Sequence, residues 1–391
     1  MIVGGRRTDS GDGLGLRARR HLHRPGNVPL SLALALLIAL GAPASASASN
    51  TLGAKMFGVS PGGAFQNSDA GTLSRDLDTL QRAGSKWLRV DINWAQIQRS
   101  GPTSYDWAAI DRVVQRAQAR GMRVLGTIVY TPGWARPSGT SATYGPEPAS
   151  YALFARRAVK HYSAMGVHTY EVWNEPNVPA FWTPAPNVAA YTRLLQAAYP
   201  AIKAADPQAT VLTGGTAPEL TEGTSVVAVD WLNGIYANGR VAPVDWLDGI
   251  YANGGRGFFD AVSHHPYCWP EMPGKATAWS AWYQMYGTNP SLRSVMVDNG
   301  DGAKKIWATE FGAPTNGPSG SHVSEATQAR MIARAYEVWS NYSWGGPLFT
   351  YSGRDLGTST STRENFFGLV RKDFTRKPSF SAYRAAATGA G

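Results

Sequence analysis

Two glutamates that end apolar, strand-like runs are the residues of this sequence best suited to carry out a reaction. Glu175 follows Asn174 at the end of the run 170–175, and Glu310 ends the run 306–310. A carboxyl group beside apolar and aromatic residues can serve as a general acid, because such surroundings disfavour its charged form. Two carboxyl groups across one pocket can cleave a glycosidic bond, since one protonates the leaving oxygen while the other attacks the sugar or activates water. A lone Glu at a strand end more often faces water, so the hypothesis depends on the pair.

The elements that must bring this pair together alternate regularly along the chain. Apolar runs at 56–60, 87–93, 123–130, 168–175, 210–214, 259–264, 305–310 and 347–351 predict strands. Helical patterns at 70–83, 107–120, 149–165, 188–205, 325–341 and 379–387 lie between or after them, and Gly84, Gly121 and Gly166 are predicted to end the first three. This alternation predicts an α/β fold, a single (β/α)8 TIM barrel without an appended β-sandwich. An open doubly wound sheet is the alternative, but no phosphate-binding glycine loop follows the first strand. In a barrel both glutamates fall at the C-terminal ends of strands, where active sites lie.

The N-terminal residues read as a targeting segment. An arginine-rich lead precedes the apolar run 30–40, and small residues follow over 42–48. The apolar run is too short to span a membrane, so we expect residues 1–48 to be a secretory signal peptide and leader. We therefore expect residues 49–391 to form the barrel of a secreted protein with no membrane span.

Composition argues against several other classes of function. The formal net charge is +10, but the basic residues outside the leader are scattered and form no dense stripe, so we expect no nucleic-acid partner. Cys268 is the only cysteine, so no internal disulfide can form, and we expect a buried thiol. Adjacent His264 and His265 point to opposite faces of a strand, so the sequence predicts no metal site and no cofactor. No pattern in the sequence indicates an oligomeric state.

A tandem duplication stands between the fifth and sixth predicted strands. Residues 229–238 recur as residues 244–253 with one difference, Asn233 against Asp248. Each copy has apolar residues at helical spacing, and a barrel needs one helix here. We expect the second copy, which leads into the sixth strand, to be that helix.

The motifs Trp-Asn-Glu-Pro at 173–176 and Glu-Phe-Gly at 310–312 resemble those of the clan A retaining glycoside hydrolases. The resemblance extends over most of residues 57–384 and is greatest to family 39, of β-xylosidase type, with family 5, of cellulase type, next. It implies that Glu175 is the acid/base, that Glu310 is the nucleophile and that Asn174 binds the sugar 2-hydroxyl. In the same way it places Tyr267 near Glu310, His265 beside it on the sixth strand, and Arg89 where it keeps Glu310 ionised.

Other polar and aromatic residues are assigned by strand parity and by position. Glu171 lies deeper on the strand of Glu175 and is expected to pair with a cation, while His264 is expected to serve packing. Asp91 and Asn93 are expected inside the barrel as support for Arg89. The resemblance implies a Trp at the end of the eighth strand, a position that Tyr351 or Trp344 would take. Aromatic residues after strand ends could stack on sugars: these are Trp94, Trp182 and, ahead of them, Trp134 and Trp269.

The sequence thus predicts an exported retaining β-glycosidase. Its substrates would be the O-glycosidic bonds of plant, microbial or cell-wall oligo- and polysaccharides. The alternative is a barrel that binds polysaccharide without cleaving it.

Overall fold

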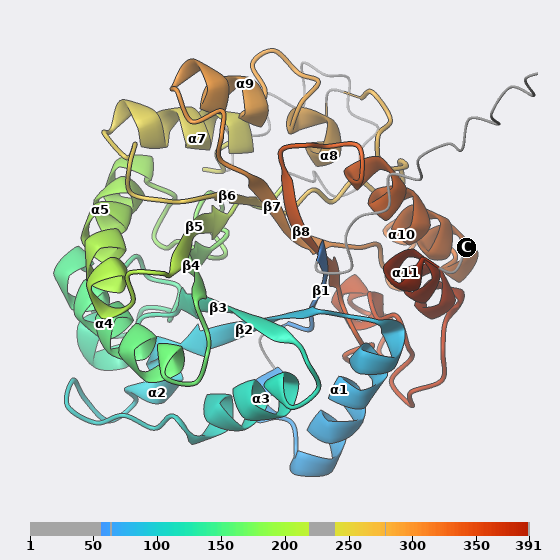
Figure 1. Cartoon of the computed structure of the whole chain (residues 1–391), viewed down its shortest axis with the longest axis horizontal. Coiled ribbons are helices and arrows are strands. Elements are labelled where there is room, and N and C mark those ends of the chain that lie inside the picture. The colour runs from blue at the N-terminus through green and yellow to red at the C-terminus, as the bar shows by residue number, and fades with distance from the viewer. Residues whose placement is uncertain (1–55, 63–64, 219–238, 278, 390–391) are drawn as a thin grey trace, which may run out of the picture. The chain divides into compact units, whose positions relative to one another are not determined.

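A (β/α)8 barrel, as predicted, is the architecture of this chain. The computed structural model describes residues 56–62, 65–218, 239–277 and 279–389. Within these ranges eight parallel strands form one curled sheet at the centre of a ring of helices (Figure 1). The strands are β1 (Phe57–Ser60), β2 (Trp87–Asn93), β3 (Arg123–Val129), β4 (Thr169–Asn174), β5 (Thr210–Gly215), β6 (Val262–His264), β7 (Ile306–Phe311) and β8 (Gly345–Tyr351).

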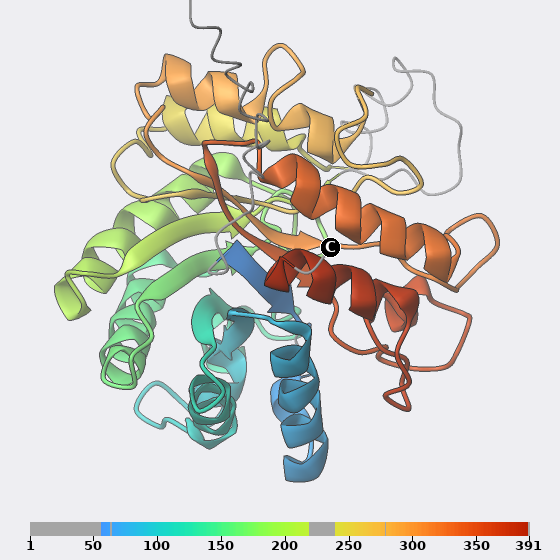
Figure 2. The ribbon, with the colours of Figure 1, turned by 45° about the vertical axis from the view of Figure 1, so that its right-hand side comes forward.

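The helices follow the strands and pack against the outside of the sheet. In Figure 2, α10 and α11 lie side by side on the flank that covers β8 and β1. The helices are α1 (Ala70–Ala83), α2 (Trp94–Ile97), α3 (Ala108–Gln118), α4 (Pro148–Ser163), α5 (Val188–Ala205), α7 (Pro243–Ala252), α8 (Ala281–Gln284), α9 (Leu292–Asp298), α10 (Glu325–Trp339) and α11 (Pro378–Thr388), and the 3-10 turns are η2 (Phe65–Asn67), η3 (Gly133–Ala135) and η4 (Arg363–Phe366).

Contacts between β5 and β6 close the barrel. These two strands stand at the ends of the sheet order β5-β4-β3-β2-β1-β8-β7-β6. Isolated parallel bridges join Leu212 to Ala261 and Thr216 to His264 across the seam. Closure brings the C-terminal ends of all eight strands to one rim, which is where a barrel carries its site.

Local signals in the sequence set several helix boundaries. Asp69 caps α1 by accepting hydrogen bonds from two backbone N–H groups at 2.9 Å. Gly84 ends the same helix with φ of 93°, in the left-handed region that glycine adopts without steric cost. Ser324 caps α10 by accepting from the N–H of Thr327 at 3.1 Å. Gly84 ends α1 where the sequence predicts it.

Side chains that alternate along the strands fill the barrel in layers. A buried apolar cluster inside it consists of Trp87, Leu125, Leu212, Ala261, Trp307 and Phe349. Because the side-chain period of a strand is two, the next residues on the same face follow two positions later. On β2 and β3 these are polar, Arg89 and Thr127, and on β7 the next is Thr309. The polar layer thus lies between an apolar floor and the rim.

The tandem duplication contributes one helix to the described structure. That helix is α7, which is built from the second copy, as predicted, and buries Trp246, Leu247 and Ile250. The first copy lies outside the described residues. Between β6 and β7 the structure also has α8 and α9, which the sequence patterns did not predict.

No helix in the described part of the chain combines the length and apolar character that a membrane crossing requires.

Candidate active site

A cleft of about 890 Å³ opens at the C-terminal rim of the barrel. Glu175 and Glu310 both line it, as expected for residues at the ends of β4 and β7. The lining includes residues at or just beyond the end of every strand: Ser60, Asp91, Tyr130, Asn174, Glu175, Ala217, Tyr267, Trp269, Glu310 and Tyr351.

Glu310 is held by three donors, two on strands β1 and β2 and one in the segment after β6. Arg89 Nη1 donates to its Oε1 over 2.6 Å, and the Tyr267 hydroxyl donates to its Oε2 over 2.9 Å. The Ser60 hydroxyl lies 3.5 Å from Oε1. Burial and the charge of Glu310 raise the pKa of Tyr267 well above its usual range, so the phenol stays protonated and remains a donor. These contacts fix the orientation of the carboxylate.

Arg89 links Glu310 to a buried polar network inside the barrel. Its Nε donates to Glu171 Oε2 over 2.7 Å, and its Nη2 donates to Asn174 Oδ1 over 2.7 Å. Burial alone would raise the pKa of Glu171, but the charge of Arg89 holds that pKa below its usual range. Thr127, Ser263 and Thr309 also donate to Glu171. The prediction that Glu171 pairs with a cation inside the barrel is confirmed.

Glu175 lies beside a buried histidine and close to Glu310. His265 Nδ1 is 2.8 Å from Glu175 Oε1 and 3.8 Å from Glu310 Oε2. Burial alone would lower the pKa of His265, but the charges of Glu310 and Glu175 raise it above its usual value. Ligand atoms of Glu175, His265 and Glu310 lie within 4.8 Å of one another, so one oxygen of each carboxylate is within that distance of the other.

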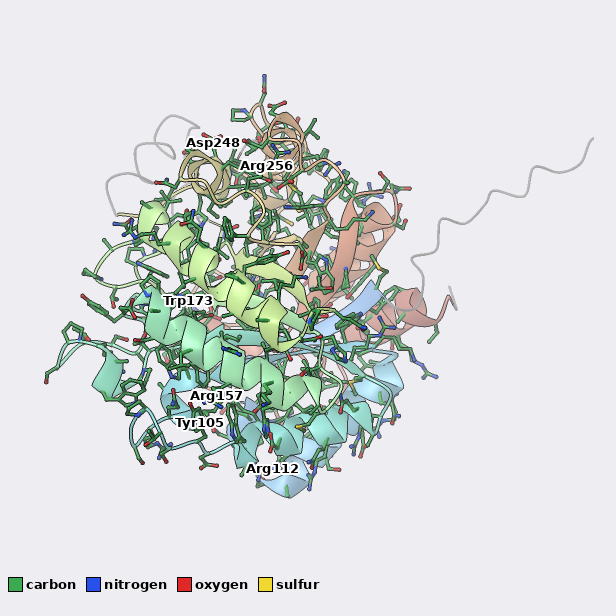
Figure 3. The ribbon with its side chains drawn as sticks, turned by 60° about the vertical axis from the view of Figure 1, so that its left-hand side comes forward. Tyr105, Arg112, Arg157, Trp173, Asp248 and Arg256 are labelled. Carbon is green, nitrogen blue, oxygen red and sulfur yellow. The ribbon has the colours of Figure 1, made fainter. Side chains whose placement is uncertain are left out.

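The end of β4 departs from regular strand geometry just where these residues are presented. Trp173 has φ of 74° and Glu175 has φ of 45°, values that are uncommon for residues other than glycine. Trp173 therefore turns out of the barrel and packs edge-to-face on Trp182, on the side covered by α4 and α5 (Figure 3). The residue after it, Asn174, faces the cleft and contacts Arg89. Such backbone strain at a functional strand end is typical of sites that must hold a side chain in one place.

A glycine on β5 makes room for His265. A Cβ atom at Gly215 would come within 2.4 Å of His265 Nε2, so any larger residue there would displace the imidazole. Nε2 is buried and has no hydrogen-bond partner among the described residues. The polar contacts of the ring are therefore made through Nδ1, by the hydrogen bond to Glu175 and the longer ion pair to Glu310.

The predicted aromatic residues divide into two groups. Trp269 and Tyr351 line the cleft, and Tyr351 occupies the end of the eighth strand. Trp344 precedes β8, at the other end of that strand, and stacks on Tyr342 with ring centroids 4.5 Å apart, so it does not reach the site. Trp134 is 39% exposed, and its indole donates to the carbonyl of Gln98, outside the cleft lining. The prediction that Trp134 lines the substrate pocket is not supported.

Two further tryptophans, also candidates for sugar stacking, belong to the core. Trp94 is fully buried and stacks on Phe154 with centroids 5.3 Å apart. Trp182 is 4% exposed and packs edge-to-face on Tyr191. Neither ring can meet a substrate, because both are buried against other aromatic side chains. Position after a strand end did not distinguish these rings from Trp269.

His264 and Cys268 serve packing. His264 Nδ1 lies 2.8 Å from the Thr216 hydroxyl, and burial lowers the pKa of His264 to about 3, so the ring is neutral. Burial raises the pKa of Cys268, whose thiol donates to the carbonyl of Glu271. A buried protonated thiol is not a nucleophile.

Several cleft residues were not predicted. Asp91 lines the cleft and makes no hydrogen bond or ion pair to Arg89, but its charge raises the pKa of Arg89. Asn93 caps α2 by accepting from the N–H of Gln96 at 3.0 Å, so the prediction that it supports Arg89 is wrong. Tyr130, at the end of β3, lines the same wall as Asp91. The strand-end position of Tyr130 was a signal that could have found it. Further additions come from loops and from η4, among them Phe181, Arg240, Arg363, Glu364 and Phe367.

Glu175, His265 and Glu310 are also the set of side chains, within the described ranges, whose ligand atoms are close enough to share one metal ion. Arg89 and Tyr267 already donate to Glu310, and His265 already contacts Glu175. The three groups thus already have partners in the protein. This arrangement suits acid–base chemistry between two carboxyl groups, and that chemistry needs no metal.

Comparison with known families and structures places the chain among glycoside hydrolases. Residues 46–347 match the family model described as cellulase (glycosyl hydrolase family 5). The resemblance to family 39, placed first from the motifs, is not confirmed, because the motifs at 173–176 and 310–312 are common to the clan and do not separate its families. No curated protein sequence gives a significant match.

Solved structures of glycoside hydrolases share the fold. A family 39 glycoside hydrolase from Bacteroides cellulosilyticus WH2 is 22% identical with a TM-score of 0.64, over 87% of this chain and 64% of that one. GH5_18 from Streptomyces cattleya, solved with GlcNAc, is 16% identical with a TM-score of 0.58, over 85% of this chain and 79% of that one. A family 1 β-glucosidase from Thermotoga maritima is 14% identical with a TM-score of 0.57, over 88% of this chain and 99% of that one. The chain thus spans less than two thirds of the family 39 structure, and at these identities the likeness is one of fold.

Proposed function

We propose that this chain, which belongs to the cellulase family of glycosyl hydrolases (family 5), is an exported retaining β-glycosidase that acts by double displacement. Its substrates are O-glycosidic bonds in plant, microbial or cell-wall glycans. Retention is supported above all by the carboxylate pair, whose nearest oxygens lie within 4.8 Å of each other. Retaining enzymes place their carboxyl groups roughly 5–5.5 Å apart, whereas inverting enzymes leave roughly 6.5–9.5 Å for a water molecule.

The two carboxyl groups take different roles because their surroundings differ. Glu310 receives hydrogen bonds from Arg89 and Tyr267, which orient it to attack the anomeric carbon. Glu175 protonates the leaving glycosidic oxygen as the bond to the sugar breaks, which yields a glycosyl-enzyme ester on Glu310. Glu175 then removes a proton from water, the water oxygen bonds to the anomeric carbon, and the ester bond breaks to restore Glu310.

His265 and Asn174 support these steps from β6 and β4. A protonated His265 can donate from Nδ1 to Glu175, and this bond orients the acid. Asn174 Oδ1 accepts from Arg89, and this contact leaves the amide nitrogen free to donate to a sugar hydroxyl, since no described residue accepts from it. Trp269 and Tyr351 provide ring surfaces on which a sugar can stack.

Hydrolysis of aryl β-glycosides tests the reaction directly. The panel holds gluco-, xylo-, manno- and arabino-configured sugars, and proton NMR of the first product shows whether the anomeric configuration is retained. Glu310→Ala should abolish turnover on every substrate, and azide should restore part of it as a glycosyl azide of inverted configuration. The inverted anomer as first product from the wild-type enzyme would refute double displacement.

The acid role of Glu175 is tested by leaving groups. Glu175→Ala should lower kcat/KM by about 10²–10⁴-fold on substrates with poor leaving groups, and far less on activated phenols that depart without a proton. Equal losses on both kinds of substrate would remove the acid role. If the wild-type protein binds oligosaccharides but cleaves none of the panel, the non-catalytic binding barrel becomes the better interpretation.

Export rests on the sequence of residues 1–48. Expression of the full chain with its own N-terminus in a bacterial host should yield a processed protein outside the cytoplasm. Mass spectrometry of that protein should place the new N-terminus near residue 49, and an unprocessed cytoplasmic product would contradict export.

A further inference from the structure

Two polar side chains on one wall of the cleft take no part in the steps described above. Asp91 projects from β2, and Tyr130 directly follows β3, its neighbour in the sheet. Both line the cleft that holds Glu310. Across the described ranges, neither the carboxylate nor the phenol makes a hydrogen bond, and Asp91 makes no ion pair.

Asp91 makes no hydrogen bond or ion pair with the nearby arginine, although their charges interact. The hydrogen bonds of Arg89 go to Glu171, Glu310 and Asn174, at 2.6–2.7 Å. Asp91 is therefore an additional carboxylate in a half-buried place that already holds Glu171 and Glu310. Burial, opposed by Arg89 and reinforced by the two glutamates, raises the pKa of Asp91 to about 6.

An unpaired carboxylate in such a place is unfavourable in the free protein, because burial removes water without supplying donors. The same position becomes favourable when a ligand supplies hydroxyl donors, since hydrogen bonds to a charged acceptor are among the stronger ones in proteins. Tyr130 adds a hydroxyl that can donate or accept beside it. This chemistry suits a neutral polyhydroxylated ring. It does not suit an acidic sugar, whose carboxylate would be repelled by Asp91 and Glu310.

We propose that Asp91 and Tyr130 form the hydroxyl-binding wall for the sugar ring that becomes attached to Glu310, and that they select a neutral sugar with a hydroxyl at the position they face. This inference rests on the proposed function. It adds the substrate class and two specificity-determining residues. Asp91 accepts from the hydroxyl, and Tyr130 fixes the same or the adjacent one. When the ring enters, its hydroxyl donates to Asp91 in place of the limited water that reaches this half-buried carboxylate. The enzyme therefore binds the sugar with that hydroxyl more tightly than its deoxy analogue.

The test compares variants on a set of aryl glycosides that each lack one hydroxyl. The sugar is the one that the wild-type enzyme cleaves best, and its monodeoxy derivatives are made at each ring position except the anomeric one. The wild-type enzyme should lose about 10- to 100-fold in kcat/KM on one derivative, the expected loss for one hydrogen bond to a charged group. Asp91→Ala should lose a similar factor on the parent sugar, and no further factor on that derivative. Tyr130→Phe should lose about 2- to 10-fold in kcat/KM on the parent sugar, as expected for a neutral hydrogen bond. Its loss in kcat/KM should be smaller on the derivative that lacks the hydroxyl bound by Tyr130.

A merely structural role for Asp91 predicts a different pattern. In that case Asp91→Ala would lower kcat/KM by the same factor on the parent and on every derivative, so that the losses multiply, and the proposal would be overturned. Asp91→Asn keeps the shape of the side chain and serves where Asp91→Ala does not fold, with the same comparison of parent and derivative. Its amide presents a weaker acceptor, so its loss on the parent should lie between those of the wild type and of Asp91→Ala.

Failure of the proposed function is distinguishable from failure of this inference. A wild-type enzyme that cleaves the parent glycoside while all losses multiply keeps the function and removes the role of Asp91. A wild-type protein without turnover removes the function. Affinities for the parent glycoside and its derivatives, measured by calorimetry, then make the same comparison. A loss of affinity in Asp91→Ala that is confined to one hydroxyl supports the wall, and a uniform loss of affinity overturns it.

Discussion

Asp91→Asn should make the protein more stable at neutral and alkaline pH and leave its stability unchanged in acid. The rise in the pKa of Asp91 from 3.8 to about 6 corresponds to about 3 kcal/mol of disfavoured ionisation in the folded state, at about 1.36 kcal/mol for each tenfold change. Water in the open cleft screens part of this cost, so we expect a gain of about 1–2 kcal/mol for the variant. Asn carries no charge and therefore avoids the cost at every pH.

The sign of the pH dependence follows from the direction of the shift. Because the folded protein binds this proton more tightly than the unfolded chain, ionised Asp91 destabilises the fold above pH 6. Below about pH 4 the carboxyl is protonated in both states, and the cost disappears. The difference in stability between the variant and the wild type should thus be full at pH 8, shrink between pH 6 and pH 4, and vanish below.

The assay is urea unfolding followed by tryptophan fluorescence, at pH 8, 7, 6, 5 and 4, for the wild type and two variants. The control is Asp248→Asn, an exposed position on α7 that Figure 3 shows at the outside of the barrel. The chain itself carries Asn at the corresponding position of the first repeat copy, Asn233. The control should give a difference near zero at each pH. A difference for Asp91→Asn that is equally large at pH 4 and pH 8, or a less stable variant at pH 8, would refute the reasoning.

Three further predictions use matched pairs or simple removal. Trp269→Ala should lower kcat/KM on aryl glycosides by about 2- to 15-fold, the expected loss for one stacked ring. Trp134→Ala, outside the cleft, should change kcat/KM by less than about twofold on these short substrates. Similar losses for both variants would contradict the placement of Trp269, and not Trp134, in the substrate pocket. Trp246→Ala should destabilise the protein by about 3–5 kcal/mol in urea unfolding, because this ring is 1% exposed and packs on Tyr191. Trp231→Ala, in the first repeat copy, should destabilise it by about 1 kcal/mol or less. A larger loss of stability for Trp231→Ala than for Trp246→Ala would show that the first copy supplies the structural contact. Prolonged treatment with EDTA should leave kcat and KM unchanged, since both carboxylates act without an ion, and activity that is lost and then restored by one divalent cation would show that the carboxylate pair binds a metal.

The architecture and the catalytic pair could be predicted because they depend on signals that are local in sequence. Apolar runs with a period of two, helical runs with a period of 3.6, and glycines that adopt positive φ are properties of short segments, and eight such units close in only a few ways. Glu175 and Glu310 follow from the same logic, because strand order alone sends them to one rim. Glu171 and His264 were also placed correctly, since the parity of β4 and β6 holds at those positions.

Regular alternation along the strands fails at two places near the site, where the direction of the side chains could not be read from parity. Parity puts Trp173 on the face of Glu171, but its φ of 74° turns it outward and brings Asn174 to Arg89. A register shift between Ala308 and Phe311 likewise lets Thr309 and Glu310 both face inward, which regular alternation forbids.

What the sequence determined by itself is therefore the barrel, the rim and the two carboxyl groups on it, because these follow from periodicity and from the ends of strands. Only the tertiary structure decided which neighbours those groups meet. It buried Trp94 and Trp182, left Trp134 outside the cleft, and set Asp91 beside Glu310 without a partner. The physical reason is that burial and pairing are sums over contacts between segments far apart in the chain, and a strand or loop carries no local record of which segments will cover it.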